Sequence, residues 1–535
     1  MELLPQRAAR LTVVALALAL VAPPAAAARP PLEQPPSQTE PPRFFRLSAN
    51  EVEGIADRAA RVQEERRAHP DLDPTAYTRG IGRWQVSYFS DGVEEAQVIV
   101  DDRSGAVLEQ WSGPQVAWTM ARGYEGAFGR KLNAPYVWLP LCLLFLAPFV
   151  DPRRPFRLLH LDLLVLLAFG VSHLFFNRGE ISTSVPLVYP VLLYLLVRML
   201  VAGFRGRERE ERLVPHAPAM WLVVGLVFLV AFRAGLNVVD SNVIDVGYSG
   251  VIGADRIVDG DELYGDRFAS DNEHGDTYGP VNFLFYVPFE QALSWSGSWD
   301  DLPAAHGAAL AADLLVLLGL MLLGRRLRPG AEGRTLGLAL AFGWAAYPYS
   351  SFTLQSNAND TLVALAVVGA LLAAGPALRG VAVGLGAAAK FAPLALAPLF
   401  ATAGGERRPR GALVFAAALA VVLVVTVAPF VPDGGLRELY DRSLGYQAGR
   451  PSPFSIWGQE PSLDWLQTAA KVAALGLALL VAFVPRRKSP AQLAALGAAV
   501  LIALQLAATH WFYLYVVWFA PLVLVALFAP LRSQA

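Results

Sequence analysis

The sequence predicts an all-α polytopic membrane protein of about 13 transmembrane helices, preceded by a small N-terminal α+β extracytoplasmic domain. The first supporting observation is composition. The 535 residues are 55% hydrophobic and only 17% charged, with a mean hydropathy of +0.41. The second is a series of apolar runs of bilayer-spanning length from Ala134 nearly to the C-terminus. The third is the strand-like alternation of apolar and polar residues over 83–113, before the first of those runs.

Net charge and cysteine content exclude several classes of protein. The formal net charge is −1, so the chain as a whole does not attract nucleic acid, and no nucleic-acid partner is expected. The single cysteine, Cys142, lies inside an apolar run. It excludes an intrachain disulfide and any metal or redox site built from several cysteines.

The N-terminus has the three-part pattern of a secretory signal peptide over residues 1–28. Arg7 and Arg10 precede a short apolar core, and Ala-x-Ala sites follow between Ala25 and Ala28. An uncleaved anchor helix is the alternative. Either interpretation places the next segment outside the cytoplasm. Residues 29–42, rich in Pro, Gln and Ser, are predicted to be a flexible linker.

A small α+β domain is predicted over residues 43–115. Helical periodicity begins after a capping residue, Ser48, and stops at Pro70. The segments "RWQVSYFSDG" and "EAQVIVDDRSGAVLEQWSG" then alternate as strands joined by turn residues. The second of them contains a strand, an Asp-x-x-x-Gly turn and a further strand, and in this it resembles the PepSY domain. The resemblance assigns the domain no activity.

The remaining chain, residues 134–530, is predicted to be one multi-pass domain. Its loops "DPRRPFR", "FRGREREERL", "GRRLRPGAEGR", "GGERRPRG" and "PRRKSP" carry the excess of Lys and Arg, so the positive-inside rule places them in the cytoplasm together with the C-terminus. The predicted spans are 134–150, 158–176, 184–203, 218–236, 304–324, 335–353, 360–375, 378–389, 392–402, 411–429, 464–484, 491–508 and 511–530.

This topology imposes two conditions. Residues 280–296 must not cross the membrane, and Pro280, Pro288 and Glu290 favour an interfacial or re-entrant helix there. The two short runs on either side of Lys390 must form an in-and-out pair that turns near the outer side. With both conditions met, loop 237–300 lies outside and is the predicted catalytic loop.

The topology also brings the informative polar residues to one outer face. Asp245 lies just beyond a span and is flanked by Val243, Ile244 and Val246. Partial desolvation there raises a carboxyl pKa and suits the group to general-base chemistry. Most other carboxylates of the loop fit a solvated acidic surface, and the "DGD" of Asp259–Asp261 is too short a match to establish a metal motif.

Three cationic candidates face Asp245 in this prediction. Lys390 lies inside an apolar run, where a charge indicates function unless the side chain extends to the interface. Arg450 stands in "GRPSP", and its planar guanidinium suits bidentate phosphate binding. His510 is either a ligand contact or one member of an aromatic belt.

Such a face suits transfer of a sugar from a lipid phosphate. An anionic leaving group needs cations, an acceptor hydroxyl needs a base, and sugars stack on aromatic rings. The remaining candidate substrate-binding residues are polar or aromatic side chains that this topology also places outside: Asn357, Asn359, Asp360, Tyr248, Tyr264, Tyr278 and Trp457.

The segments "IDVGYSGVIGADRIVDGDELYG", "TYGPVNFLFYVPF", "SNANDTLVALAVVGALLAAGPALRGVAVGLGAAAKFAPLALAPLF" and "HWFYLYVVWFAPLVLVAL" resemble the GT-C glycosyltransferases, specifically the glycosyltransferase 87 group of polyprenyl-phosphate-mannose-dependent enzymes. The resemblance extends over residues 218–530. It implies that Asp245 is the catalytic base and that Lys390 and His510 contact donor phosphate or acceptor. The chain departs from the family pattern in its N-terminal domain, in the four spans before the catalytic loop, and in Tyr278-Gly279-Pro280, where the family has Tyr-Pro-Pro.

The predicted function is therefore inverting transfer of a hexose, with mannose favoured, from a polyprenyl-phosphate donor to an extracytoplasmic glycan, lipid or protein. The donor is the one cofactor-like molecule implied; metal requirement and oligomeric state are left open. A transporter or flippase for a lipid-linked substrate is one alternative, which predicts inverted repeats and charges at both faces. A membrane sensor with a PepSY-type binding domain is the other.

Overall fold

The computed structural model describes residues 32–123, 129–206, 208–265, 268, 272, 274–299, 302–403, 408–450 and 452–533. The predicted signal peptide or anchor, residues 1–28, lies outside the described residues. The described chain divides into two units. The N-terminal unit comprises described residues from 24–127 together with 175–181, and the helical unit comprises those from 128–174 and 182–535.

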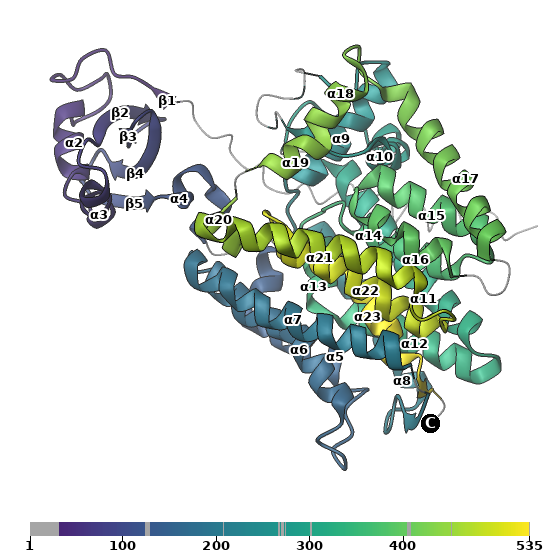
Figure 1. Cartoon of the computed structure of the whole chain (residues 1–535). Coiled ribbons are helices and arrows are strands. Elements are labelled where there is room, and N and C mark those ends of the chain that lie inside the picture. The colour runs from purple at the N-terminus through teal and green to yellow at the C-terminus, as the bar shows by residue number, and fades with distance from the viewer. Residues whose placement is uncertain are drawn as a thin grey trace, which may run out of the picture. The chain divides into compact units, whose positions relative to one another are not determined.

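The N-terminal unit is built on a five-stranded antiparallel sheet of order β1-β2-β3-β4-β5. Helices α2 and α3 pack against this sheet (Figure 1). Trp84 and Tyr88 are fully buried in the resulting core. Gln115 of this unit donates a 3.0 Å hydrogen bond to the Gly179 carbonyl, within the same unit. The elements are β1 (Leu32–Glu33), α2 (Ala49–Ala56), α3 (Ala60–Ala68), β2 (Asp73–Arg79), β3 (Arg83–Ser90), β4 (Val93–Asp101), β5 (Val107–Ser112), α4 (Pro114–Ala117) and η1 (Thr119–Arg122).

Some local predictions for this unit are confirmed and others are wrong. The Ser48 hydroxyl accepts from the Glu51 N–H as an N-cap, and the Glu51 side chain completes a capping box. One continuous helix was expected up to Pro70, whereas two helices form because the chain leaves helical geometry before Ala60. Strands β1 and β2 were not predicted, and β1 lies in the segment expected to be a linker. The PepSY resemblance stays a prediction.

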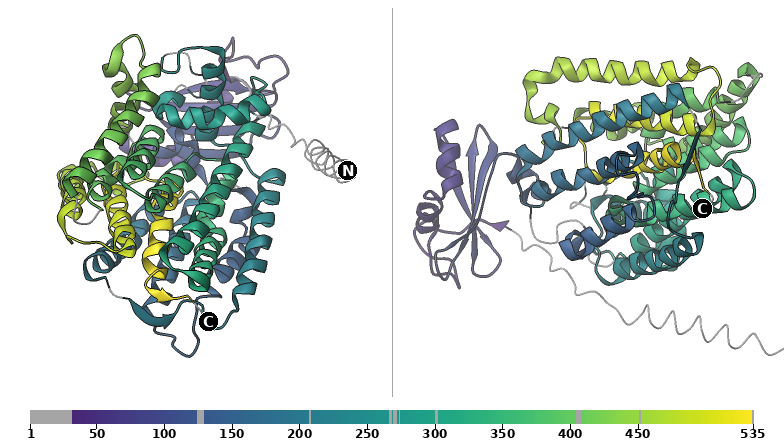
Figure 2. Two further views of the ribbon diagram at one scale, coloured as in Figure 1. Left: turned by 90° about the vertical axis from the view of Figure 1, so that its right-hand side faces the viewer. Right: turned by 90° about the horizontal axis from the view of Figure 1, so that it is seen from below.

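The helical unit contains a helix at each of the thirteen predicted apolar runs, and Figure 2 shows these helices from two further sides. The first half comprises η2 (Arg130–Asn133), α5 (Pro135–Leu146), α6 (Leu158–Phe176), α7 (Ile181–Arg205), β6 (Arg209–Arg212), α8 (Ala219–Val239), α9 (Asp245–Asp259), η3 (Gly275–Thr277), α10 (Pro280–Ala292), α11 (Pro303–Leu327), α12 (Gly330–Ala346) and α13 (Pro348–Gln355). The second half comprises α14 (Thr361–Leu372), α15 (Pro376–Ala389), η4 (Ala392–Leu396), α16 (Ala397–Ala401), α17 (Arg408–Val427), η5 (Ala428–Phe430), α18 (Gly435–Tyr440), η6 (Asp441–Gly445), α19 (Tyr446–Gly449), α20 (Ile456–Gln459), η7 (Pro461–Leu463), α21 (Asp464–Phe483), α22 (Pro490–Ala507), η8 (Tyr513–Tyr515), α23 (Val516–Phe528) and β7 (Leu531–Arg532).

Seven helices in the described part of the chain are long and apolar enough to cross a membrane by length and composition. They start at Leu158, Ile181, Ala219, Pro303, Pro409, Pro461 and Pro490. Five further apolar helices are shorter, including both members of the pair around Lys390. The protein is therefore a multi-pass membrane protein, and crossing by the full set of thirteen stays a prediction. Helix α10 has 13 residues, about 20 Å of rise, too short to cross alone.

A fully buried ion pair holds the middle of the helical unit together. Arg233 of α8 donates a 2.5 Å hydrogen bond to Asp313 of α11, and Trp344 of α12 donates to the same carboxylate oxygen at 2.8 Å. The other guanidinium nitrogen of Arg233 binds the Ala345 carbonyl at 2.9 Å and the Ser350 hydroxyl at 2.8 Å. The pair therefore also fixes the break between α12 and α13.

Removing one partner of this pair should destabilise the fold. Arg233→Met leaves Asp313 buried without its counter-charge, so we expect a loss of about 3–5 kcal/mol in unfolding free energy. The double variant Arg233→Met/Asp313→Leu should recover part of that loss, because neither charge is then buried alone. Thermal unfolding of the detergent-purified chain measures both. Arg437→Gln, whose side chain is 93% exposed, is the control; equal melting temperatures for Arg233→Met and the unmodified chain would contradict the assignment.

Candidate active site

Asp245 is positioned by a short stretch of chain that runs beside the turn after α13. The Asn242 N–H donates to the Gln355 carbonyl at 3.1 Å, and the Ile244 N–H donates to the Ser356 carbonyl at 3.2 Å. Ile244 then caps α9 with extended backbone, and Asp245 is the first helical residue. A carboxylate in the first turn is stabilised by the helix dipole. The charged group therefore stands at a helix end that the backbone holds in place.

Asn357 organises this turn. Its backbone is left-handed, with φ of +49°, and its side-chain amide donates to the Asn242 carbonyl at 2.9 Å and the Ser241 hydroxyl at 3.0 Å. Its carbonyl lies so near α9 that a Cβ on Gly247 would come within 2.4 Å of it. The small residue two positions after Asp245 thus permits the close approach. Asn357, predicted to bind substrate, holds Asp245 in position.

A cavity of about 400 Å³ opens beside Asp245. The Asp245 side chain is exposed within it, and the walls come from α9, the segment before α10, and α19. The lining residues are Asp245, Ser249, Asn272, His274, Gly275, Thr277, Tyr278, Tyr446, Gln447 and Arg450. Of the predicted cationic residues, Arg450 lines this cavity and faces the same space as Asp245.

Polar contacts hold the α18–α19 segment against η3, which forms another wall of the cavity. Arg442 forms a 3.3 Å ion pair with the buried carboxylate of Asp276, and Gln447 donates to the Thr277 hydroxyl at 2.6 Å. These contacts fix the segment that carries Arg450. An aromatic contact between His274 and Tyr446, with ring centroids 4.3 Å apart, completes the wall.

Lys390 lies next to the cavity, behind Tyr278, and not in its lining. Its ammonium forms a 2.6 Å ion pair with Asp360, whose same carboxylate oxygen accepts from the Trp518 indole at 2.7 Å. The ammonium also lies 5.4–5.5 Å from the ring centroids of Tyr278, Tyr515 and Trp518. Three aromatic faces and a carboxylate therefore hold this charge at the junction between α15 and η4.

Gly279 permits a close contact between two backbone segments. Its N–H donates to the Ala389 carbonyl at 3.2 Å, a bond that proline at this position would lack. A Cβ at 279 would also meet the Ala388 carbonyl oxygen at 2.0 Å. The glycine thus lets the Tyr278 segment contact the backbone immediately before Lys390.

The charged groups influence one another, which indicates that they share one electrostatic environment. Asp245 is accessible from the cavity, but the surrounding protein replaces much of its water. This desolvation raises the pKa of Asp245 above its ordinary value, while Arg450, the Val246 N–H and Lys390 oppose that rise. Burial holds the pKa of His510 well below its ordinary value, and the positive charges of Arg450 and Lys390 lower it further. His510 is therefore neutral at pH 7 and contributes hydrogen bonds instead of charge; its Nδ1 lies 2.9 Å from the Ser452 hydroxyl.

Other candidate substrate-binding residues make contacts within the protein, and their role in binding stays a prediction. Tyr248 is 2% exposed, and its ring centroid lies 4.3 Å from that of Trp299. Tyr264 is fully buried and donates to the Tyr278 carbonyl at 2.7 Å. Trp457 donates its indole N–H to the Leu506 carbonyl at 2.9 Å. The Asn359 amide donates to the Asn282 side-chain oxygen at 2.8 Å, which leaves Asn359 Oδ1 and Asn282 Nδ2 without a partner among the described residues.

Several lining residues were not found from sequence: Ser249, Asn272, His274, Tyr446 and Gln447. They are ordinary polar side chains on α9, on the segment before α10 and on α19, and nothing in their spacing separates them from solvated neighbours. Trp518 lies in the last apolar run, where an aromatic residue is unremarkable without its contact to Asp360.

The acidic "DGD" of Asp259–Asp261 ends α9, with Gly260 in the left-handed region at φ +78°. Among the described residues, no group of three or more His, Cys, Asp or Glu is arranged to hold a metal.

The fold and site define a class: a multi-pass membrane protein with a polar cavity beside helix ends that carry a carboxylate and cations. Residues 277–533 match the model of glycosyltransferase family 87. The chain is accordingly a membrane glycosyltransferase. The matched region includes Lys390, Arg450 and His510 but begins after Asp245, so the match is shorter than the resemblance described for 218–530. No curated protein matches the chain.

The close approach at Gly279 should be essential for activity. Gly279→Ala forces a Cβ against the Ala388 carbonyl, which displaces Tyr278 or the chain next to Lys390. We expect at least a tenfold loss of glycosyl transfer, because small displacements of positioning groups cost about 10²-fold in other enzymes. Gly235→Ala on α8, where a Cβ has open space, is the matched control. Full activity of Gly279→Ala in a transfer assay would show that this contact does not position the site.

Proposed function

We propose that this enzyme transfers a hexose, with mannose as the favoured sugar, from a polyprenyl-phosphate donor to an extracytoplasmic acceptor with inversion at the anomeric carbon. One observation carries the proposal: Asp245 and Arg450 line the same 400 Å³ cavity, and Lys390 is near enough to influence the pKa of Asp245. The site thus offers a base for an acceptor hydroxyl and positive charge for a phosphate leaving group.

The reaction is a single displacement. The acceptor oxygen attacks the anomeric carbon as the bond from that carbon to the phosphate oxygen breaks. Asp245 takes the proton of the acceptor hydroxyl, and the departing polyprenyl phosphate keeps the electron pair of the broken bond. A single carboxylate base supports this sequence, because no covalent glycosyl–enzyme intermediate is formed. The raised pKa of Asp245 makes it a better proton acceptor than an ordinary surface aspartate.

Arg450 and Lys390 stabilise the departing phosphate from different positions. Arg450 lines the cavity, and its guanidinium suits two parallel hydrogen bonds to phosphate oxygens. Lys390 provides charge from behind the Tyr278 ring. An ammonium has three donors, and among the described residues Lys390 uses one of them, for Asp360. Positive charge fixed in advance favours the transition state, in which negative charge grows on the phosphate.

Buried polar atoms near Lys390 are candidate contacts for sugar hydroxyls. Within the described chain, Asp360 Oδ2, Asn359 Oδ1 and Asn282 Nδ2 have no hydrogen-bond partner. Buried polar groups without partners cost free energy, which hydroxyls of a bound ligand would offset. These atoms lie around the same ion pair that orients Lys390, so they support sugar binding next to the phosphate.

Asp245→Asn is the direct test of the base. The amide keeps the size of the side chain but cannot take a proton, so transfer should fall by about 10²–10⁴-fold. Donor binding should persist, since Asn removes no cation. The measurement is transfer of radiolabelled hexose from synthetic polyprenyl-phosphate hexose by purified full-length enzyme. Asp259→Asn, an exposed residue at the other end of α9, should retain activity. Undiminished transfer by Asp245→Asn would exclude the proposed role.

The pH dependence provides a second test. Asp245 must be ionised to accept a proton, so activity falls as pH drops through its pKa. Because burial raises that pKa, the acidic limb should lie at higher pH than for a solvated aspartate. Arg450 lowers the pKa of Asp245, so Arg450→Gln should shift the limb to still higher pH while also lowering the maximal rate. A limb that stays in place, or moves to lower pH, in Arg450→Gln would contradict this electrostatic coupling.

A further inference from the structure

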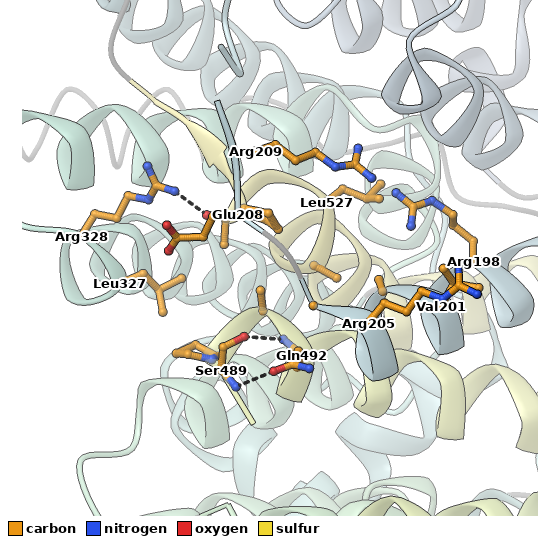
Figure 3. A pocket seen from close by; sticks show the side chains of 17 residues that line it. Arg198, Val201, Arg205, Glu208, Arg209, Leu327, Arg328, Ser489, Gln492 and Leu527 are labelled. Carbon is orange, nitrogen blue, oxygen red and sulfur yellow. Dashed lines mark hydrogen bonds between the residues drawn. The ribbon is translucent and has the colours of Figure 1, made fainter. Parts of the chain in front are cut away.

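A basic double pocket lies at the opposite helix ends from the candidate active site. The larger pocket, about 860 Å³, is lined by residues from the end of α7, strand β6, the α11–α12 junction, the start of α22 and the end of α23 (Figure 3). The smaller, about 230 Å³, shares Leu327 and Pro490 with it. The residues near the candidate active site lie at the other ends of the same helices: Trp518 lies at the start of α23, and His510 follows the end of α22.

The lining of these two pockets is strongly biased toward positive charge. Four arginines line the larger pocket: Arg198, Arg205, Arg209 and Arg328. Three cations line the smaller pocket: Arg326, Arg379 and Lys488. Among the described lining residues of both, Glu208 is the one acidic side chain. The basic loops "FRGREREERL", "GRRLRPGAEGR" and "PRRKSP" thus converge on one place, which a general charge bias of loops does not require.

Two of the four arginines of the larger pocket form ion pairs with carboxylates. Arg198 is paired with Asp162 at 2.9 Å, and Arg328 with Glu332 at 3.4 Å. Within the described part of the chain, no carboxylate lies within ion-pairing distance of Arg205 or Arg209. Figure 3 draws these two guanidinium groups on the same side of the pocket. They are the charges available to an anion.

Two further features strengthen the site for an anion. The N-terminal turn of α22, Ser489 to Gln492, lines the same pocket. The N–H groups of Ser489 and Gln492 are already bonded in the capping box of this turn, so the helix favours an anion through its dipole and not through these donors. Strand β6 pairs with β7, and the Arg209 N–H donates to the Pro530 carbonyl at 2.8 Å. Arg209 therefore projects from backbone that the C-terminal end of the chain holds in place.

Apolar residues beside the charges indicate a lipid. Val201, Leu327 and Leu527 line the larger pocket together with the arginines. Val201 is 42% exposed, and Val197 and Phe204 of the same helix are exposed too, so the pocket opens onto an apolar strip of α7. A free phosphate needs no such strip, whereas a lipid places its phosphate on the arginines and its chain along the strip.

We propose that this double pocket binds the phosphate headgroup of an anionic membrane lipid. The site is separate from the catalytic cavity, and its existence does not depend on the sugar or acceptor of the transfer reaction. Arg205 and Arg209 hold the phosphate oxygens, the dipole of α22 adds positive potential at its N-terminus, and α7 accommodates the lipid chain.

The test uses the full chain purified in detergent and follows its melting temperature, which a ligand of the folded state raises in a concentration-dependent way. Dihexanoyl phosphatidate, a short lipid with a phosphate monoester head, should raise the melting temperature to saturation. Dihexanoyl phosphatidylcholine should not do so, and inorganic phosphate should act only at much higher concentration. An equal effect of phosphatidylcholine would overturn the phosphate site, and an equal effect of inorganic phosphate would overturn the lipid assignment.

Variants locate the site. Arg205→Gln/Arg209→Gln should weaken phosphatidate binding about tenfold or more, since each substitution removes charge-assisted hydrogen bonds. Arg153→Gln/Arg154→Gln, two exposed arginines that line neither pocket, is the matched control and should bind normally. Arg450→Gln should also bind normally, which separates this site from the catalytic cavity. Unchanged affinity in the Arg205/Arg209 variant, or lost affinity in Arg450→Gln, would overturn the proposal.

Discussion

The buried ion pair between Lys390 and Asp360 is the interaction around which the site is arranged. Each residue lies where a helix ends: Asp360 caps the start of α14 and Lys390 ends α15. Charges among apolar helices are costly unless they are paired and hydrogen-bonded. The ion pair itself, the hydrogen bond from the Trp518 indole to Asp360, and the rings of Tyr278, Tyr515 and Trp518 around the ammonium offset that cost. Interrupted helices thus place a fixed charge next to the cavity, as membrane proteins allow where backbone breaks are enclosed by protein.

Close backbone contacts connect that charge to the carboxylate. Asn357 and the segment before Asp245 are joined by hydrogen bonds, and Gly247 permits α9 to approach the Asn357 carbonyl. Gly279 makes the corresponding approach beside Ala388. Asp245 and Lys390 are therefore both positioned by the backbone contacts at Asn357 and at Gly279. A site built this way is rigid before the substrate arrives, which electrostatic stabilisation of a transition state requires.

Much of this arrangement follows from the sequence, and the rest depends on contacts that sequence does not encode locally. The helices follow from apolar runs, and Asp245, Lys390 and Arg450 stand out because charge next to or within such runs is costly. Aromatic residues carry no such signal: Tyr248, a candidate for substrate binding, lies buried in a hydrophobic cluster. Asn357 was correctly placed near Asp245, but its role depends on which backbone groups fold against it. Partner choice is a tertiary property, so the sequence alone does not separate packing roles from binding roles.

The central claim is that the transferred sugar reacts between Asp245 and Arg450. The most direct measurement is an electron cryo-microscopy map of the full chain in lipid nanodiscs with a polyprenyl-phosphate hexose analogue whose glycosidic oxygen is replaced by carbon. The account predicts density for the sugar in the cavity of about 400 Å³, with the anomeric carbon facing Asp245 and the phosphate on Arg450 on the side of Lys390. A sugar bound elsewhere, with Asp245 remote from its anomeric carbon, would contradict the account.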